Sequence, residues 1–252
     1  LLYGDIQRTA DPAVKWSREV LHPEHIPALV RRGLQDAMNA PRGPVLLSLP
    51  IDVLTRPAGV TPTGSSDIHR RSTAAGLHEL AGLLTNADPD KLVIIASDEV
   101  EESGAVAELV DVADFLGARV YGSSWPGSLP FPTDHPLWAG SLPPDAAAMR
   151  MVLADFDVLF IAGDNPFIPY LYSEGEMVPA TCRILQITGD AAQAGRSYPT
   201  EIACIGDLKP SLLTLQTLMM KARGERSEAV AALLEAAKKD RAERLHHLDA
   251  RL

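Results

Sequence analysis

The chain has 252 residues, of which 46% are hydrophobic and 22% charged, and its formal net charge at pH 7 is −10. This length allows one large or two smaller domains. The acidic balance, with no basic block, argues against a nucleic-acid partner, and no apolar run reaches the ~20 residues of a membrane span. Cys182 and Cys204 lie beside or inside apolar, strand-like runs, where free thiols in a reducing cytoplasm fit better than a disulfide framework or a metal site.

The first part of the chain predicts a helix, a strand and a linker. Apolar residues recur at helical spacing over residues 24–40. A Gly-Pro turn then leads into an apolar run over 44–49 that ends at Pro50, which predicts one short buried strand. The pattern offers no earlier strand to pair with it, and a lone buried strand leaves its backbone hydrogen bonds unmade. Because the chain also starts at Leu1 rather than Met, we expect it to begin inside a domain.

Residues 55–73 are rich in Pro, Gly, Ser and Thr, which predicts a linker and a domain boundary. Beyond this linker, apolar strands alternate with helices. The alternation predicts a parallel sheet covered on both faces, and right-handed crossovers then give a doubly wound, Rossmann-like α/β domain. Strands are expected at 92–97, 118–123, 157–163, 183–188 and 201–206, and helices at 74–86, 101–117, 145–154, 207–222 and 225–248.

Three predicted strands end in polar turns, at residues 97–105, 163–166 and 188–190. Ligands of open parallel sheets bind outside these carboxyl ends, and a nucleotide needs glycines there so that backbone amides can approach a phosphate. The first turn instead carries four carboxylates, and no GxGxxG or P-loop motif occurs. Taken from the residues alone, these turns favour a structural role over a nucleotide site.

A long proline-rich segment holds the one histidine of interest, His135. Four prolines occur from Pro126 to Pro136 inclusive, and such a loop is stiff enough to hold a side chain in place. Histidine titrates near neutral pH and can transfer protons. Local sequence alone nevertheless favours an exposed surface histidine.

Four segments, taken in order, carry a resemblance to a known family: SDEVEESGA at 97–105, FPTDHPLWAG at 131–140, DVLFIAGDNPF at 157–167 and RILQITGDAAQAGRSYPTEIACIGD at 183–207. They resemble the central domain of thiamine-diphosphate-dependent enzymes of the acetolactate synthase and benzoylformate decarboxylase group. The helix at 24–40 with GPVLLSLPIDVL is similar to the end of that family's pyrimidine-binding domain. The resemblance implies a partial pyrimidine-binding domain (1–54), a linker (55–73), a central domain (74–222) and a helical linker toward a pyrophosphate-binding domain (223–252).

The resemblance also implies cofactors that this chain does not bind alone. The family's cofactor-activating glutamate and its metal segment, GDG followed by an asparagine, do not occur in the chain. Thiamine diphosphate and Mg²⁺ are therefore expected in the intact enzyme, and the chain by itself is expected to be inactive. FAD, which acetolactate synthase-like relatives bind across the central domain, is not expected, because Ser97 replaces the usual glycine and Glu99, Glu101 and Glu102 crowd the turn.

The leading expectation is a fragment of a thiamine-diphosphate-dependent 2-oxo acid decarboxylase, similar to benzoylformate decarboxylase. His135 matches the family's histidine that assists proton transfer, so the resemblance implies a catalytic role for it. The substrate would be a small 2-oxo acid, and the assembly a homodimer or homotetramer. An acetolactate synthase-like carboligase is the first alternative. A domain that binds FAD or ADP, or that only holds two catalytic domains in register, is the second.

Overall fold

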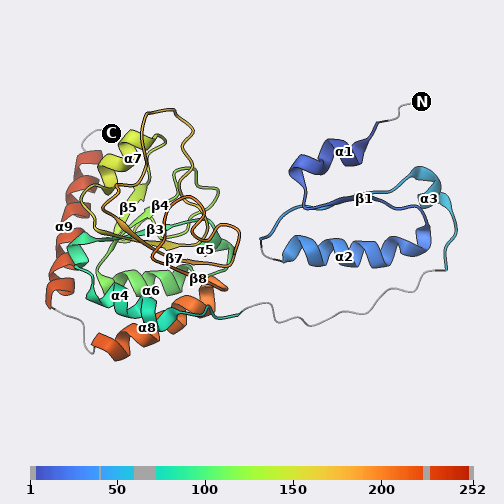
Figure 1. Ribbon diagram of the computed structural model, residues 1–252. Helices are drawn as coiled ribbons and strands as arrows, with labels where there is room; N and C mark the ends of the chain where they lie inside the picture. Colours follow the sequence, from blue (N-terminus) through green and yellow to red (C-terminus); the bar gives the residue numbers. More distant parts are fainter. Residues whose placement is uncertain (1–3, 40, 60–71, 224–227, 250–252) are drawn as a thin grey trace. The chain divides into compact units, whose positions relative to one another are not determined.

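The computed structural model describes residues 4–39, 41–59, 72–223 and 228–249. It divides into two compact units, Leu1–Arg70 and Arg71–Leu252, which are drawn in Figure 1. Most of the predicted linker (55–73) lies outside the described residues, because the structure describes it only up to residue 59 and again from residue 72. Within the described residues, no helix has both the length and the apolar character needed to cross a membrane.

The first unit pairs two short strands beside a helix. Strand β1 (Ser17–Glu19) runs parallel to β2 (Leu46–Ser48), and α2 (Ile26–Met38) is tied to them by the Trp16 indole, whose Nε1 donates to Asp36 Oδ2 at 2.9 Å. The expectation that the strand at 44–49 is buried and unpaired was therefore wrong. The sequence hid its partner because Ser-Arg-Glu has no apolar alternation, and β2 itself is only half-buried. The remaining elements of this unit are α1 (Ile6–Ala10), η1 (Asp11–Ala13), η2 (Pro23–His25) and α3 (Ile51–Thr55).

The second unit contains a six-stranded sheet in the order β5-β4-β3-β6-β7-β8. Every neighbouring pair is parallel, which confirms the predicted doubly wound α/β fold. Strand order runs outward in both directions from the β3–β6 pair, so the topological switch point lies between these two strands. The strands are β3 (Leu92–Ala96), β4 (Arg119–Gly122), β5 (Trp138–Ser141), β6 (Val158–Ala162), β7 (Arg183–Thr188) and β8 (Ile202–Ile205).

Helices cover both faces of this sheet, as Figure 1 shows. Successive side chains of a strand point to opposite faces, so Ile94 and Phe160 join one core cluster while Val93 and Leu159 join the other. The first cluster packs under α4 (Leu77–Asn86), α6 (Val106–Leu116) and α8 (Leu208–Arg223), and the second under α7 (Ala146–Leu153). Strands buried on both faces explain the continuous apolar runs in the sequence.

Two elements differ from the sequence prediction. The helix expected over 101–117 is divided into α5 (Glu99–Glu102) and α6, and the break falls at Gly104, whose φ of +62° favours glycine. Strand β5 was not predicted, because its four residues follow a proline-rich loop. It lies at the sheet edge, and its register with β4 shifts between Val120 and Tyr121.

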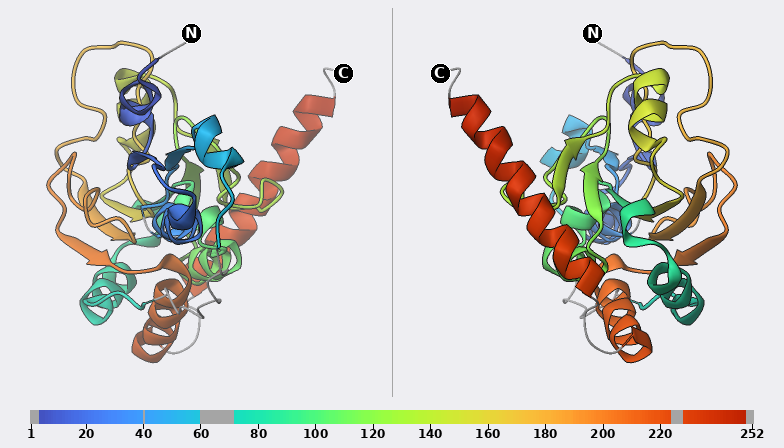
Figure 2. Two further views of the ribbon diagram at one scale, coloured as in Figure 1. Left: turned by 90° about the vertical axis from the view of Figure 1, so that its right-hand side faces the viewer. Right: turned by 90° about the vertical axis from the view of Figure 1, so that its left-hand side faces the viewer.

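The last helix, α9 (Glu228–Asp249), begins against the core of the second unit. Val230 and Leu234 are buried there, and Figure 2 shows the helix running along one side of the unit. Gly117, at the carboxyl end of α6, has a φ of +69°, and a Cβ on it would lie 3.0 Å from Val230 Cγ1. The first turns of the segment assigned to a linker (223–252) thus pack on the central domain.

Candidate functional site

The crevice at the β3–β6 switch point is the place where an open parallel sheet ordinarily binds a ligand. Here Ser97, which follows β3, fills it. The Ser97 hydroxyl accepts hydrogen bonds from the Asp164 N–H (3.1 Å) and the Glu99 N–H (3.3 Å). Gly163 follows β6 with a φ of +110°, and a Cβ on it would lie 1.9 Å from Ser97 Oγ. The two strand ends therefore meet closely, and Ser97 is 1% exposed.

Glu99 closes the same crevice on the side of β7. Its carboxylate accepts hydrogen bonds from the Thr188 hydroxyl at 2.8 Å and from the Gly189 N–H at 2.6 Å. Burial raises the pKa of Glu99 from 4.5 to about 7, and the nearby Asp164 and Asp190 act in the same direction, while the two hydrogen bonds oppose the change. The carboxylate thus takes the backbone amide that an anionic ligand would use.

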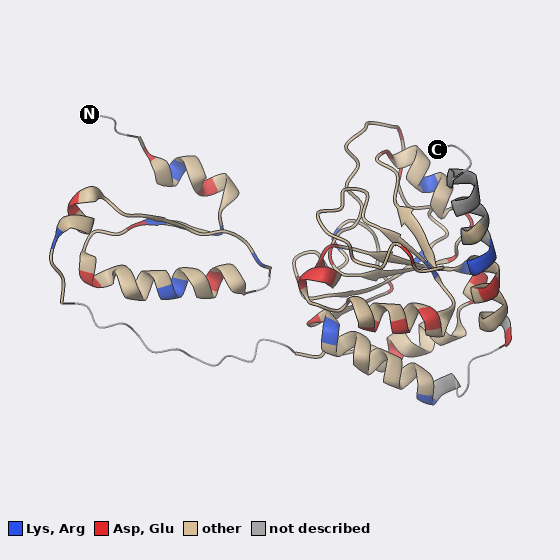
Figure 3. Ribbon diagram, turned by 180° about the vertical axis from the view of Figure 1, so that it is seen from behind, with Lys and Arg blue, Asp and Glu red and all other residues tan. Residues whose placement is uncertain are grey.

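Asp98 occupies a second set of donors. Its carboxylate accepts hydrogen bonds from the Gly127 N–H (2.8 Å), the Ser128 N–H (3.1 Å) and the Ser128 hydroxyl (3.1 Å). Burial raises the pKa of Asp164, and the neighbouring Asp98 contributes to this rise. Figure 3 shows the concentration of acidic positions on α5 and α6.

These contacts bear on the fit of a flavin dinucleotide. Its pyrophosphate needs free amide donors and no facing carboxylate, whereas the donors at Gly127, Ser128 and Gly189 already serve the chain's own Asp98 and Glu99. The residues present do not fit the group. Among the described residues, no three His, Cys, Asp or Glu side chains gather where they could hold a metal ion.

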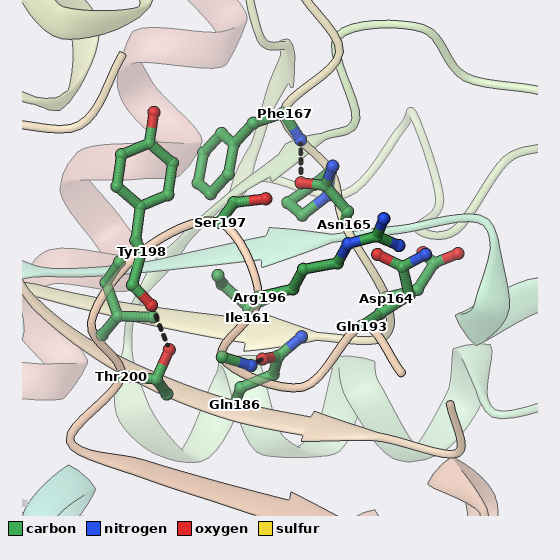
Figure 4. A pocket seen from close by; sticks show the side chains of 13 residues that line it. Ile161, Asp164, Asn165, Phe167, Gln186, Gln193, Arg196, Ser197, Tyr198 and Thr200 are labelled. Atoms are coloured by element: carbon green, nitrogen blue, oxygen red, sulfur yellow. Dashed lines mark hydrogen bonds between the residues drawn. The ribbon is translucent and has the colours of Figure 1, made fainter. Parts of the chain in front are cut away.

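A small pocket lies beside the switch point (Figure 4). Gln186 forms part of its wall: its Nε2 donates to the Gly163 carbonyl at 3.0 Å, and its Oε1 accepts from the Gly195 N–H at 3.1 Å. Figure 4 also shows Arg196 extending over the pocket toward Asn165. The sequence interpretation missed this pocket. Its one signal was a glutamine between the apolar residues of the strand RILQIT.

His135 lies at the other edge of the sheet. It precedes β5 by three residues, and the Val120 N–H of β4 donates to the Leu137 carbonyl at 2.9 Å. Because β4 and β5 are parallel, the residues that begin them lie together at the amino-terminal ends of the strands. The carboxylates of the crevice lie at the opposite, carboxyl ends. The His135 side chain is 18% exposed, and its Nε2 lies 3.5 Å from Asp114 Oδ1 on α6. The structure does not bring His135 and the acidic turns together.

The comparisons with known proteins agree with this architecture. Residues 77–218 match the family model of the thiamine pyrophosphate enzyme central domain. A benzoylformate decarboxylase of Pseudomonas aeruginosa is 28% identical over an alignment of 225 residues, which covers 87% of this chain and 41% of that protein. A probable acetolactate synthase large subunit of Methanocaldococcus jannaschii is 27% identical over 220 residues, covering 81% of this chain and 35% of that protein.

A solved structure extends the likeness to three dimensions. The thiamine diphosphate-dependent 4-hydroxybenzoylformate decarboxylase of Rhodococcus jostii RHA1 superposes with a TM-score of 0.75 at 26% sequence identity. The match covers 89% of this chain and 42% of that one. The chain therefore spans about two fifths of the length of the relatives that it matches.

Proposed function

We propose a decarboxylase function from one premise: the chain belongs to the thiamine pyrophosphate enzymes, whose central domain it contains. The intact protein is proposed to be a thiamine-diphosphate-dependent 2-oxo acid decarboxylase similar to benzoylformate decarboxylase. The observation that carries the proposal is the 28% identity to such an enzyme across 87% of the chain. The same likeness supports a role for the chain as a part of a longer enzyme rather than as a catalyst by itself.

A carboligase of the acetolactate synthase kind is the second candidate, because the chain is 27% identical to a probable member of that group. The crevice favours the decarboxylase. Acetolactate synthase-like relatives are expected to place FAD across this domain, but Glu99 and Asp98 already hold the amide donors that FAD would need.

Bound thiamine diphosphate supplies the carbon nucleophile and the electron sink of this chemistry. The role proposed for this chain's own residues falls to His135, which would hold or transfer a proton at the reacting group. Its place in a fixed loop supports this role. The His135 N–H donates to the Pro132 carbonyl and the Trp138 N–H to the His135 carbonyl, both at 3.1 Å, so the backbone that carries the imidazole is fixed.

The test uses the full-length enzyme with thiamine diphosphate and Mg²⁺, supplied with a panel of aromatic and aliphatic 2-oxo acids. The proposal predicts CO₂ release with an aldehyde as the main product. A 2-hydroxy-2-methyl-3-oxo acid as the main product would instead establish the carboligase. The variant His135→Ala should lower turnover at least tenfold, since proton-transfer groups contribute roughly 10²–10⁴-fold, while its melting temperature stays within a few degrees of that of the wild type. Unchanged turnover would remove His135 from the mechanism.

A further inference from the structure

An apolar groove runs through the first unit between α2 and β2. Apart from a glycine its walls carry apolar side chains, among them Val30, Gly33 and Leu34 of α2 and Pro44, Val45 and Leu47 of the strand segment. Val30, Leu34 and Met38 follow one another at i, i+4 spacing and are 39%, 65% and 52% exposed, so they form one stripe along α2. Arg32, whose guanidinium lies 5.8 Å from the centre of the Trp16 ring next to β1, lies on the opposite side of the helix. The apolar stripe therefore faces the edge of β2 that points away from β1.

Beside this groove β2 presents an open sheet edge. In the described part of the chain its one neighbouring strand is β1. The Leu46 N–H donates to a carbonyl beside β1 at 3.1 Å, and the Ser48 carbonyl accepts from an N–H beside β1 at 2.9 Å. Backbone groups alternate in direction along a strand, so those of Val45, Leu47 and Leu49 point to the open edge. An edge of this kind is a template for a further strand.

The open edge is complementary to itself. A two-fold axis perpendicular to the sheet beside Leu47 sets β2 antiparallel to β2 of a second copy and keeps both α2 helices on the same face of the sheet. Leu47 then lies opposite the partner's Leu47, and Val45 opposite the partner's Leu49, so that the outward-pointing backbone groups pair with each other. Two strands alone make a marginal sheet, and this pairing turns two such sheets into one of four strands.

The α2 helices of the two copies then meet at a normal packing distance. Each α2 lies against both of its strands, because a Cβ on Gly33 would lie 3.2 Å from Val45 Cγ2 of the β2 segment and 3.7 Å from the Trp16 ring next to β1. With neighbouring strands about 4.8 Å apart, a helix centred over β1 and β2 lies about 5 Å from the axis. The two helices are therefore about 10 Å apart, as packed helices are. Leu34 meets the partner's Leu34, and the first residue of one stripe meets the last of the other.

We propose that the 252-residue chain forms a two-fold dimer through this edge, in which β2 pairs with β2 of a second copy and the two α2 stripes cover each other's groove. The inference goes beyond the proposed function, because it concerns how two chains meet and not what the enzyme converts. The chain has a net charge of −10, but no charged side chain lines the groove. The contact therefore brings apolar surfaces together without setting like charges against each other.

Light scattering after size-exclusion chromatography measures the mass of the chain in solution. The proposal predicts twice the 27.1 kDa of one chain. Leu34→Asp sets two carboxylates against each other at the axis and should raise the dissociation constant of the dimer at least tenfold. Its melting temperature in dilute solution should not change, because this side chain is exposed in a single copy. Met151→Asp, at a residue of similar exposure on α7 of the second unit, is the matched control and should leave the dimer intact.

Cross-linking and hydrogen exchange locate the contact. At the helix spacing given above, the Leu34 Cα atoms of the two copies lie about 5 Å apart, within the reach of a disulfide. Leu34→Cys should therefore give a reducible dimer on mild oxidation. Ala28→Cys, at an exposed position of α2 away from the stripe, should give none beyond that of the wild type. The Leu47 amide should exchange slowly in the wild type and fast in Leu34→Asp.

Two results would overturn the proposal. A chain of 27.1 kDa whose Leu47 amide exchanges fast has an uncovered edge, which is then left to a strand from a longer polypeptide. A dimer that Leu34→Asp does not weaken and Leu34→Cys does not cross-link is held together by another surface. Neither result depends on turnover, so the outcome is independent of the proposed decarboxylase function.

Discussion

At the scale of single residues, Glu99 differs from the exposed glutamates of α5 in its burial and in its raised pKa. A free glutamate would be fully ionised at neutral pH, but burial raises the pKa of Glu99 to about 7. The folded state therefore binds a proton more tightly than the unfolded state, whose glutamate keeps a value near 4.5. The stability that Glu99 contributes is complete below the lower value and is lost as the pH rises through the higher one.

Glu99→Gln should remove this dependence. A pKa difference of this size corresponds to about 3 kcal/mol, and screening at the partly exposed side chain reduces the expected effect to about 1–2 kcal/mol. Glutamine can still accept from the Gly189 N–H and donate to the Thr188 hydroxyl. The variant should match the wild type near about pH 4 and exceed its free energy of unfolding at about pH 8. Urea unfolding across this pH range measures the difference.

Glu101→Gln is the matched control, because Glu101 lies on the same short helix with an exposed side chain. It should not alter how stability changes with pH. Parallel curves for Glu99→Gln and the wild type would contradict the prediction and would mean that Asp164, whose pKa is also raised by burial, carries the dependence.

At the scale of elements, the sequence predicted those whose apolar pattern is complete. Strands β3, β6 and β7 are buried on both faces, and their runs LVIIA, VLFIA and RILQIT are hard to read as anything other than buried strands. Strands β1 and β5 were missed because short edge strands gain their stability from a neighbour and not from their own pattern. Dependence on distant neighbours also limited how much of the site could be predicted from the sequence. The four carboxylates of the first turn were visible, but their pairing with Gly127 and Gly189 depends on long-range contacts.

The helix α9 provides the test at this scale. Val230 is 1% exposed and packs against Gly117, so Val230→Ala should destabilise the second unit by about 1–3 kcal/mol through the lost contacts and the cavity. This should lower the melting temperature, measured by circular dichroism, by several degrees. Leu213→Ala removes an apolar side chain that is 54% exposed on α8 and should change it little. Equal melting temperatures for Val230→Ala and the wild type would mean that α9 is only a linker.

At the scale of the whole molecule, the chain combines a family membership with an incomplete set of cofactor-binding segments. It contains neither a GDG segment followed by asparagine nor, among its described residues, a cluster of three metal-ligating side chains. The 252-residue chain is therefore expected not to bind thiamine diphosphate tightly, even with Mg²⁺. FAD should fail as well, because Asp98 and Glu99 already accept from the amides that its phosphates would need.

Isothermal titration calorimetry of the chain with each cofactor measures both affinities, and the full-length enzyme titrated with thiamine diphosphate and Mg²⁺ is the positive control. A micromolar dissociation constant for the chain, worth about 8 kcal/mol, would show that the 252 residues hold a cofactor site that their sequence does not reveal. Tight FAD binding would have a different meaning. It would require Glu99 to leave Thr188 and Gly189, so Glu99→Gln would then change the FAD affinity, and the assignment would move toward the carboligase branch of the family.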